Sequence, residues 1–202
     1  MGIYDRLLAI RTRRQAGDPP GNVALVITER DLLAPGAYRT LEDFLGWALA
    51  HDASTVYVYV SVLDKEVVPT LRRALGDIDA PAPLAVRGPT DDHPVTEPVQ
   101  VSIGLGGKYE FTTAVKRLAV AVEDGELAPE EIDDAAIERH LIFGPDPDLV
   151  IKTGAERLSD FMIWQSVYSE LYFTDVNWQN FRYRDYLRAV REYKRRHRRF
   201  GQ

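Results

Sequence analysis

The sequence contains no cysteine, and its four histidines are widely separated, at His51, His93, His140 and His197. Without cysteine the chain can form neither disulfides nor thiolate metal sites. Histidines scattered in this way do not indicate a metal cluster either. These absences predict an intracellular, cytoplasmic protein without a structural metal.

Long apolar runs are also missing. No stretch approaches the roughly 18 consecutive apolar residues that a membrane-spanning helix needs. The first residues, MGIYDRLLAIRTRRQ, are typical of an amphipathic helix within residues 1–20 rather than of a secretion signal. We therefore expect a soluble protein that can still touch a membrane surface at its periphery.

The chain does have enough apolar material for a core. Of its 202 residues 45% are hydrophobic, which suits one domain over residues 1–202. The net charge is -6, yet nine of the 25 Lys and Arg residues lie in residues 182–202, a predicted basic C-terminal helix. Because the remaining body is acidic and no RNA-binding motif occurs, we expect no nucleic-acid partner.

Apolar segments of strand length alternate with segments of helical periodicity. Expected strands lie at residues 22–28, 54–62, 83–88, 99–105 and 148–153, and expected helices at 39–52, 64–78, 110–125, 129–141 and 160–173. This alternation predicts an α/β fold with a central, mostly parallel sheet wrapped by helices. Ligands bind such folds beyond the carboxyl ends of the strands.

Groups that bind anions follow two of these strands. The last strand runs into KTGAERLS, in which Lys152, Arg157 and Ser159 offer two charges and a hydroxyl. The turn GGK at residues 106–108 exposes backbone N–H groups. Diphosphate suits donors of this kind. Similar clusters also cap helices, so the residues alone leave both interpretations open.

The segment around these donors resembles a known family. Residues 146–178 read DPDLVIKTGAERLSDFMIWQSVYSELYFTDVNW. They closely resemble the signature of the cis-prenyltransferases, the undecaprenyl diphosphate synthase family, in which R-T-G-G-E-x-R-L-S, F-L-L-W-Q and E-L-Y-F-T-D-x-x-W follow in this order. The likeness reaches back through GGKYEFTTAVKRLA and forward to RRHRRFG. It implies a dimeric protein with a parallel sheet wrapped by helices.

The resemblance also implies an activity. Enzymes of this family add isopentenyl diphosphate to an allylic diphosphate, with Mg²⁺ helping the diphosphate to leave. By this likeness Lys152, Arg157 and Ser159 would bind isopentenyl diphosphate. Glu170 would match the carboxylate that helps to orient the C-terminal active-site elements and the metal. Lys152 stands where the family has Arg, which keeps the charge but loses the bidentate geometry.

The N-terminal half departs from the family pattern. Residues 22–33, NVALVITERDLL, align with H-V-A-I-I-M-D-G-N-x-R-W-A, and Thr28 stands where the family has the Asp expected on Mg²⁺ and diphosphate. Glu29 is a neighbouring carboxylate, but one step along the chain changes its direction. After the second strand, VSVLDKEV lacks the family's F-S-x-E-N-W-x-R. These losses converge on the allylic diphosphate site.

Three functions follow from this mixture. The family includes heteromeric enzymes in which a degenerate subunit of the Nogo-B-receptor type supplies an R-x-G, and Arg199 and Gly201 form an R-x-G here. We therefore favour a non-catalytic or weakly catalytic subunit that pairs with a catalytic cis-prenyltransferase homologue. The alternatives are an active homodimeric polyprenyl diphosphate synthase using Glu29 or Asp31 on the metal, and a module that binds isoprenoid diphosphates without chemistry.

The predicted helix at residues 160–173 bears on the partner. Its sequence, DFMIWQSVYSELYF, is too apolar for one buried stripe. A second chain is therefore expected to cover part of this segment.

Overall fold

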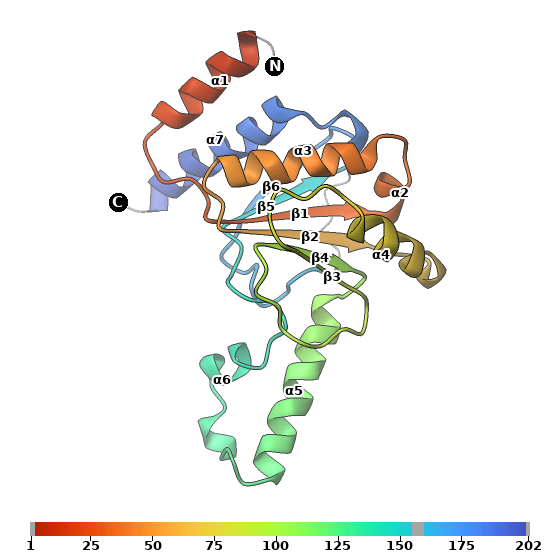
Figure 1. Cartoon of the computed structure of the whole chain (residues 1–202). Helices are drawn as coiled ribbons and strands as arrows, with labels where there is room; N and C mark the ends of the chain where they lie inside the picture. The colour runs from red at the N-terminus through yellow and green to blue at the C-terminus, as the bar shows by residue number, and fades with distance from the viewer. Residues whose placement is uncertain (1–2, 155–159, 201–202) are drawn as a thin grey trace.

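The computed structural model describes residues 3–154 and 160–200, and its centre is a six-stranded sheet in the order β3-β4-β2-β1-β5-β6 (Figure 1). The strands are β1 (Asn22–Thr28), β2 (Thr55–Ser61), β3 (Leu84–Arg87), β4 (Val99–Ile103), β5 (Leu149–Thr153) and β6 (Glu170–Thr174). All five neighbouring pairs are parallel. The predicted α/β fold with a parallel sheet is confirmed.

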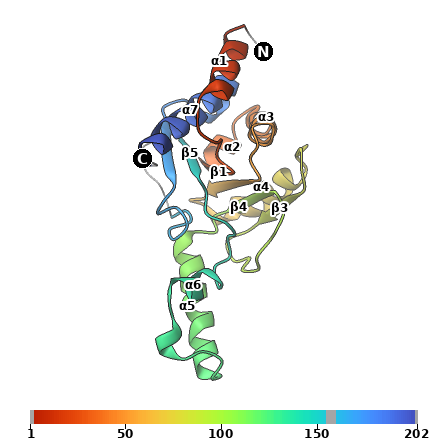
Figure 2. The same ribbon diagram turned by 90° about the vertical axis from the view of Figure 1, so that its left-hand side faces the viewer.

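The helices cover the sheet and extend beyond it. They are α1 (Ile3–Arg14), α2 (Glu29–Leu32), α3 (Ala37–Ala50), α4 (Val68–Gly76), α5 (Gly107–Glu123), α6 (Asp134–Glu138) and α7 (Tyr183–Phe200), with single 3-10 turns η1 (Lys65–Val67), η2 (Pro129–Glu131) and η3 (Trp178–Asn180). Helices α1, α3 and α7 lie at one end of the molecule, and α5 with α6 forms an arm that projects from the other end (Figures 1 and 2). None of the helices within the described residues has the length and apolar character needed to cross a membrane.

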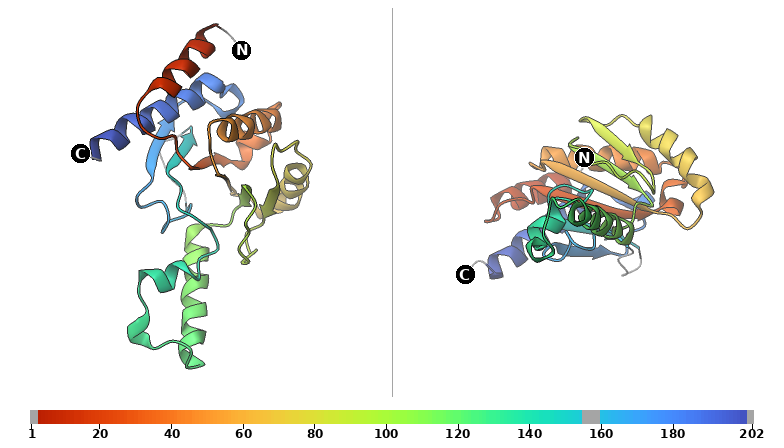
Figure 3. Two further views of the ribbon diagram at one scale, coloured as in Figure 1. Left: turned by 60° about the vertical axis from the view of Figure 1, so that its left-hand side comes forward. Right: turned by 90° about the horizontal axis from the view of Figure 1, so that it is seen from below.

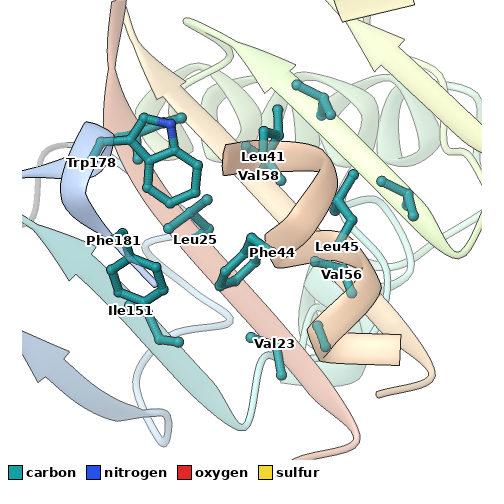
Figure 4. Packing of buried hydrophobic residues seen from close by; sticks show 14 of the residues in the cluster. Val23, Leu25, Leu41, Phe44, Leu45, Val56, Val58, Ile151, Trp178 and Phe181 are labelled. Carbon is teal, nitrogen blue, oxygen red and sulfur yellow. The ribbon is translucent and has the colours of Figure 1, made fainter. Parts of the chain in front are cut away.

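The central strands are nearly continuous apolar runs because both faces of the sheet are covered. In β1 and β2 the five middle residues are all buried. On one face, α3 packs its buried stripe against β1 and β2 (Figure 4). Phe44 of α3 lies at the centre and makes edge-to-face contacts with Trp178, Phe181 and Tyr186, at centroid distances of 6.0, 6.1 and 5.7 Å. Such pairs add about 0.5–1.5 kcal/mol each beyond the burial of their area.

The opposite face carries a smaller core, covered by irregular chain. Tyr57 and Tyr59 of β2 meet Phe143, Phe161 and Met162, which come from the two segments that flank β5. The right-hand view of Figure 3 shows this side with α5 in front. The conformation of the chain around β5 is therefore fixed by packing against the sheet.

The prediction of a helix at residues 160–173 is wrong. Residues 160–169 form turns, and β6 pairs with β5 from Leu149↔Glu170 to Thr153↔Thr174. The sequence ELYFT suits a strand, because aromatic residues and Thr favour extended backbone. Side chains fasten the turns before it, since Ser169 Oγ donates to the Pro147 carbonyl at 2.5 Å.

The helix predicted at residues 129–141 is shorter than expected. It is divided into η2 and α6, and Asp133 lies between them as the N-cap of α6. The Asp133 carboxylate accepts a hydrogen bond from the Ala136 N–H at 2.8 Å. A residue that caps one helix cannot continue the previous one, so this cap sets the break. The other predicted helices are present with shifted ends.

Candidate functional site

The topology marks one place on the sheet edge for a ligand. Strand β1 pairs with β2 on one side and with β5 on the other, so the strand order reverses between β1 and β5. Ligands of parallel α/β sheets bind outside the carboxyl ends of the strands at such a switch point. The register pairs Val26 with Lys152. Thr28 and Lys152 therefore lie at neighbouring strand ends.

Lys152 is a nearly buried cation at the end of β5. Its side chain belongs to a residue that is only 7% exposed, and Nζ donates to the Thr153 carbonyl at 2.9 Å. Burial lowers the pKa of Lys152, while the charge of Asp31 acts in the opposite sense. No ion pair links Lys152 to a carboxylate among the described residues. An anion arriving at this strand end would meet a positive charge that is poorly solvated.

The next residue, Thr153, has an unpaired hydroxyl, and Gly154 after it changes the direction of the chain. Thr153 is 2% exposed, and its Oγ1 is buried without a partner in the described part of the chain. Buried hydroxyls normally have partners, so an unpaired hydroxyl at a strand end marks a candidate binding position. Gly154 has a φ of 78°, and its N–H donates to the Thr174 carbonyl at 3.0 Å. This left-handed turn takes the chain away from β5.

Four further predicted binding residues cannot be placed at the site. Arg157 and Ser159 lie in residues 155–159, which are outside the described residues. Gly201 is also outside the described residues. Arg199 belongs to α7, but its side chain lies outside the described part. Their contacts with an anion stay predictions.

The end of β1 is closed by its own hydrogen bonds. Thr28 is the N-cap of the single-turn helix α2, and its Oγ1 accepts from the Asp31 N–H at 3.3 Å. In return, Asp31 Oδ2 accepts from the Thr28 N–H at 2.8 Å and from Thr28 Oγ1 at 2.7 Å. This is a complete capping box. Thr28 therefore contributes a helix cap and no charge.

Glu29 was the neighbouring carboxylate considered as a metal ligand, but its side chain binds backbone amides. It is 7% exposed, and Oε2 accepts from the backbone N–H groups of Leu63 at 3.0 Å and Asp64 at 3.4 Å. The side chain thus joins α2 to the segment that follows β2. These two amides hold Glu29 Oε2 against the segment after β2.

The donor set does not fit a Mg²⁺ site within one chain. The described residues contain no group of three or more His, Cys, Asp or Glu side chains that could hold a metal ion. Near the end of β1, Thr28 is neutral, Glu29 binds amides and Asp31 completes the cap. Mg²⁺ prefers one or two free carboxylates together with phosphate oxygens and water. At the end of β1 the carboxylates of Glu29 and Asp31 are both engaged by hydrogen bonds of the chain itself.

Glu170 lies far from the site in one chain. It is the first residue of β6 and pairs with Leu149, at the amino end of β5. Its Oε2 lies 3.4 Å from NH1 of Arg196. Lys152 is three residues further along the neighbouring strand, about 10 Å away at the rise of a parallel strand. The structure of one chain does not bring Glu170 to Lys152, so its metal role stays a proposal.

The glycine turn at residues 106–108 binds the chain's own carboxylate. The Gly107 N–H donates to the Asp160 carbonyl at 2.9 Å, and the Lys108 N–H donates to Asp160 Oδ1 at 2.8 Å. A Cβ on Gly107 would lie 2.7 Å from the Ile163 nitrogen. These glycines therefore allow the turns after residue 160 to pack on the start of α5. In this structure Asp160 caps the start of α5, and binding of another anion at this turn stays a prediction.

A buried charged cluster was missed by the sequence reading. Glu110 is 1% exposed, and its Oε1 accepts from the N–H groups of Ile142 and Phe143 at 2.8 and 2.7 Å and from Gln165 Nε2 at 2.9 Å. Burial raises the pKa of Glu110, while these hydrogen bonds oppose the rise. Arg87, also 1% exposed, lies over the Phe143 ring at 4.6 Å. Glu110 joins the segments before and after β5 to α5.

The signal for this cluster was weak in the sequence. Glu110 lies in the first turn of α5, where an acidic residue is favoured by the helix dipole and is usually solvated. Nothing in the local pattern marks it as the acceptor for backbone groups more than 30 residues away. Only the tertiary fold shows that use.

Comparison with known proteins places these observations in a family. A family model described as "Putative undecaprenyl diphosphate synthase" matches residues 90–201. A tritrans,polycis-undecaprenyl-diphosphate synthase (geranylgeranyl-diphosphate specific) of Methanocaldococcus jannaschii is 53% identical over 108 residues, which are 51% of this chain and 39% of the relative. An isoprenyl transferase of Thermus thermophilus is 47% identical over 110 residues, 51% of this chain and 42% of the relative. The match thus spans about two fifths of the length of these relatives.

Solved structures share the fold over nearly the whole chain. The lavandulyl diphosphate synthase of Lavandula x intermedia, in complex with dimethylallyl diphosphate, superposes with a TM-score of 0.69 at 20% identity, covering 91% of this chain and 99% of that one. A Campylobacter jejuni protein described as "a probable undecaprenyl diphosphate synthase" gives a TM-score of 0.68 at 19% identity, covering 92% and 100%. The shared fold therefore includes β1, β2 and β3, which lie outside the residues matched by the family model.

Proposed function

Because the chain belongs to the undecaprenyl diphosphate synthase family, we propose that it is a subunit of a heteromeric cis-prenyltransferase that makes polyprenyl diphosphate. In this proposal the chain binds isopentenyl diphosphate at the carboxyl end of β5. A catalytic homologue supplies the carboxylate, the Mg²⁺ and the allylic diphosphate site. The chain itself is non-catalytic or weakly catalytic.

The hydrogen bonding at the end of β1 is the main observation behind this proposal. Thr28 and Asp31 satisfy each other in a capping box, and Glu29 is bound to backbone amides. Both carboxylates at this strand end are thus engaged by hydrogen bonds of the chain itself, each through one oxygen. Beside it, Lys152 and Thr153 keep a cation and a hydroxyl without a carboxylate partner among the described residues. We therefore propose that the β5 end keeps one half of a two-substrate site and that the β1 end has lost the other half.

The sequence matches support the substrate class of the proposal. The family model covers residues 90–201, which include β5, β6 and α7, and leaves β1 and β2 outside its match. The relatives are named for the synthesis of undecaprenyl diphosphate or for isoprenyl transfer. We propose the corresponding substrate class, an isoprenoid diphosphate, for the β5 end of this chain.

The residues at the β5 end would act on the diphosphate of isopentenyl diphosphate. The Lys152 ammonium would neutralise part of its charge, and the Thr153 hydroxyl would donate to an oxygen. By resemblance, Arg157 and Ser159 would complete this contact, and Arg199 and Gly201 would reach the partner's site. The low exposure of Lys152 and Thr153 keeps water from competing for these bonds. Mg²⁺ would supply charge neutralisation at the partner's carboxylate.

An exposed apolar surface formed by the start of α5 and the turns before β6 supports a partner chain. Ile163 is 46% exposed, Val167 66% and Tyr168 92%. A cavity of about 480 Å³ lies beside them, lined by Lys108, Phe111, Thr112, Ile163, Trp164 and Val167. Phe111 and Trp164 stack at its wall, with centroids 5.9 Å apart. We propose that the catalytic homologue covers this surface, because adjacent exposed apolar residues of this size are typical of interfaces.

A second candidate function has one observation in its favour. The Asp31 carboxylate lies within hydrogen-bonding distance of Thr28, and its charge acts on Lys152. An active homodimer would need Asp31 to leave the cap and take the metal. The third candidate, a module that binds isoprenoid diphosphates without chemistry, shares the β5 site but needs no partner.

One experiment separates the three functions. The purified chain, a family member with the intact D-G-N pattern, and their mixture are assayed for Mg²⁺-dependent incorporation of labelled isopentenyl diphosphate. We expect the chain alone to be slower than the mixture by about 1000-fold or more, because a missing metal carboxylate costs several kcal/mol of barrier. We expect the mixture to exceed the homologue alone.

The other outcomes are equally distinct. Robust elongation by the chain alone that is lost in Asp31→Asn would establish the homodimeric enzyme. Binding of isopentenyl diphosphate by the chain, with no effect on the homologue, would establish the binding module. The control variant is Asp64→Asn, which changes an exposed acid after β2 without touching the Asp31 carboxylate.

A further inference from the structure

A cavity lined by arginines, the arginine cavity, lies where α7 meets β6 and the end of α1. It has a volume of about 350 Å³, and its lining consists of Gln15, Tyr172, Arg188, Arg191, Glu192 and Arg195. Gln15 directly follows α1, Tyr172 belongs to β6, and the other four residues belong to α7. The Gln15 Nε2 donates to the Arg191 carbonyl at 3.0 Å and so joins the two helices. The fold therefore brings side chains from three segments to one place.

The carboxylates near these arginines do not balance their charge. Glu192, the acid in the lining, is shared by two guanidinium groups, because its Oε1 lies 2.6 Å from Arg195 NH2 and 3.1 Å from Arg196 Nε. Arg188 pairs with Asp185 at 3.2 Å but keeps 50% of its side chain exposed, and Arg195 keeps 63%. The lining therefore has an excess of positive charge.

Arg191 is the least satisfied of the three arginines. No ion pair joins it to a carboxylate among the described residues. Its Nε is buried and has no hydrogen-bond partner in the same part of the chain. Buried N–H groups normally have an acceptor, and phosphate oxygens match the geometry of a guanidinium group well. Arg191 therefore indicates where an anion would bind.

Tyr172 offers a further donor to the same cavity. Burial raises the pKa of its phenol, while the charge of Arg188 acts in the opposite sense. The phenol thus lies within the field of Arg188 and keeps its proton at neutral pH. A protonated hydroxyl can donate to an anion beside the guanidinium groups.

The size and the walls of the cavity favour a small soluble ligand. Its volume lies at the lower end of the roughly 300–1,000 Å³ that is typical of small-molecule sites. The lining contains no aliphatic side chain, so it offers no wall for an acyl or prenyl chain. Helix α7 also borders a second cavity, of about 450 Å³, but that lining combines Lys194 with Asp18 and Asp52. The arginine cavity is therefore the better match for an anion.

We propose that the arginine cavity binds a small soluble phosphate anion, of which inorganic phosphate and diphosphate are the simplest forms. Arg191 Nε and the Tyr172 hydroxyl donate to the anion from the wall of the cavity. The more exposed Arg188 and Arg195 neutralise its charge from the rim. The cavity contains none of the residues at the β1 and β5 strand ends, so this site does not depend on the proposed function.

Calorimetric titration of the full chain with inorganic diphosphate, without Mg²⁺, measures the affinity. The titrations are made in the Lys152→Met variant, in which the anion site proposed at β5 is weakened. Adding Arg188→Gln with Arg195→Gln should lower the affinity at least about tenfold, because charge-assisted hydrogen bonds are lost. Arg188→Lys with Arg195→Lys keeps the charge without the guanidinium geometry and should lower the affinity less.

The matched control removes the same charge outside the cavity. Arg73→Gln with Arg184→Gln changes two exposed arginines, on α4 and on the first turn of α7, that do not belong to the lining. The affinity of this pair should stay within about twofold, because exposed charges at a distance are screened by salt. Circular dichroism checks that every variant is folded.

A signal from the cavity itself locates the anion. The NMR signal of the Arg191 Nε–H, assigned with Arg191→Lys, should shift as diphosphate is added and should saturate at the affinity that calorimetry gives. An unmoved signal, or equal losses of affinity in the two arginine pairs, would overturn the proposal. So would binding to phosphatidylglycerol vesicles that diphosphate does not displace, since the cavity would then belong to lipid headgroups. If Lys152→Met alone abolishes all binding of diphosphate, the arginine cavity is not a site, while the proposed function at β5 stands.

Discussion

The carboxyl ends of β1 and β5 are neighbours in one sheet, yet they differ in how their polar groups are satisfied. At β1, Thr28 and Asp31 complete a capping box and Glu29 binds two amides. At β5, Lys152 is nearly buried with a single carbonyl partner, and Thr153 Oγ1 has no partner among the described residues. The first arrangement stabilises the fold. The second leaves polar groups that a ligand could satisfy.

The difference makes the end of β5 the better candidate for a binding site. Local rules of capping and hydrogen bonding are obeyed at one strand end and broken at the other, and broken rules tend to mark functional sites. A stability-only chain would have replaced the buried lysine, because burying a charge without a carboxylate costs free energy. We therefore interpret the β5 end as the working part of the site. The variants below test this comparison, ordered by their expected effect on the free energy of unfolding.

The largest loss of stability is expected when Glu110, which holds the chain around β5, is replaced. Glu110→Ala should lower the free energy of unfolding by about 3 kcal/mol, because it leaves two buried N–H groups and the Gln165 amide without their acceptor. Urea unfolding measures the change. Glu130→Ala, at an exposed glutamate on the arm, is the matched control and should stay within about 0.5 kcal/mol of the wild type. A loss below 1 kcal/mol for Glu110→Ala, on the scale of a single neutral hydrogen bond, would show that the cluster does not hold the chain around β5.

A smaller loss is expected at the closed strand end. Glu29→Gln removes the charge that accepts from Leu63 and Asp64, and should cost about 1–2 kcal/mol. The same loss should appear with and without Mg²⁺ in urea unfolding. If Glu29 were a metal ligand, Mg²⁺ would stabilise the wild type and this response would vanish in the variant. Glu66→Gln, an exposed acid in the same region, is the control.

Replacing Lys152 at the end of β5 should stabilise the fold instead of weakening it. Lys152→Met should raise the free energy of unfolding by about 1 kcal/mol, because an apolar side chain of similar length replaces a poorly solvated charge. It should also lower the affinity for isopentenyl diphosphate by at least about tenfold, since a charge-assisted hydrogen bond is lost. Calorimetric titration measures the affinity, and Lys152→Arg, which keeps the charge, should retain it. Unchanged affinity in Lys152→Met would place the ligand elsewhere.

The pH dependence of that stability gain has a defined sign. Burial lowers the pKa of Lys152 in the folded chain below its unfolded value. The cost of the buried charge is therefore complete below the folded pKa and falls as the pH rises through it. We expect the gap between wild type and Lys152→Met to narrow at alkaline pH and to close near pH 10.4, about the pKa of an unfolded lysine. A gap that widens over this range would contradict a burial cost.

The sequence predicted the parallel sheet because its strands are unbroken apolar runs with helical segments between them, as NVALVIT and TVYVYVS show. It predicted Lys152 as a strand-end cation for the same reason. It failed at residues 160–173, where an apolar run fits a helix or a strand and pairing with β5 decides. It could not show that Asp160 fills the glycine turn or that Glu29 binds amides, because these partners are distant in the chain.

The smallest effect on stability, with a large effect on assembly, is expected for the exposed apolar surface near β5. Val167 is 66% exposed, so Val167→Asp should change the free energy of unfolding by no more than about 0.5 kcal/mol. If the catalytic homologue covers this surface, the same variant buries a charge on binding and should weaken the complex by about tenfold or more. Leu63→Asp, at a side chain that is 80% exposed after β2, is the matched control and should leave the complex intact. Sedimentation velocity of the mixed proteins measures both. Equal weakening by the two variants would show a general effect of added charge. No weakening by Val167→Asp would show that the catalytic homologue does not cover this surface, and the proposed division of the site between two chains would lose this support.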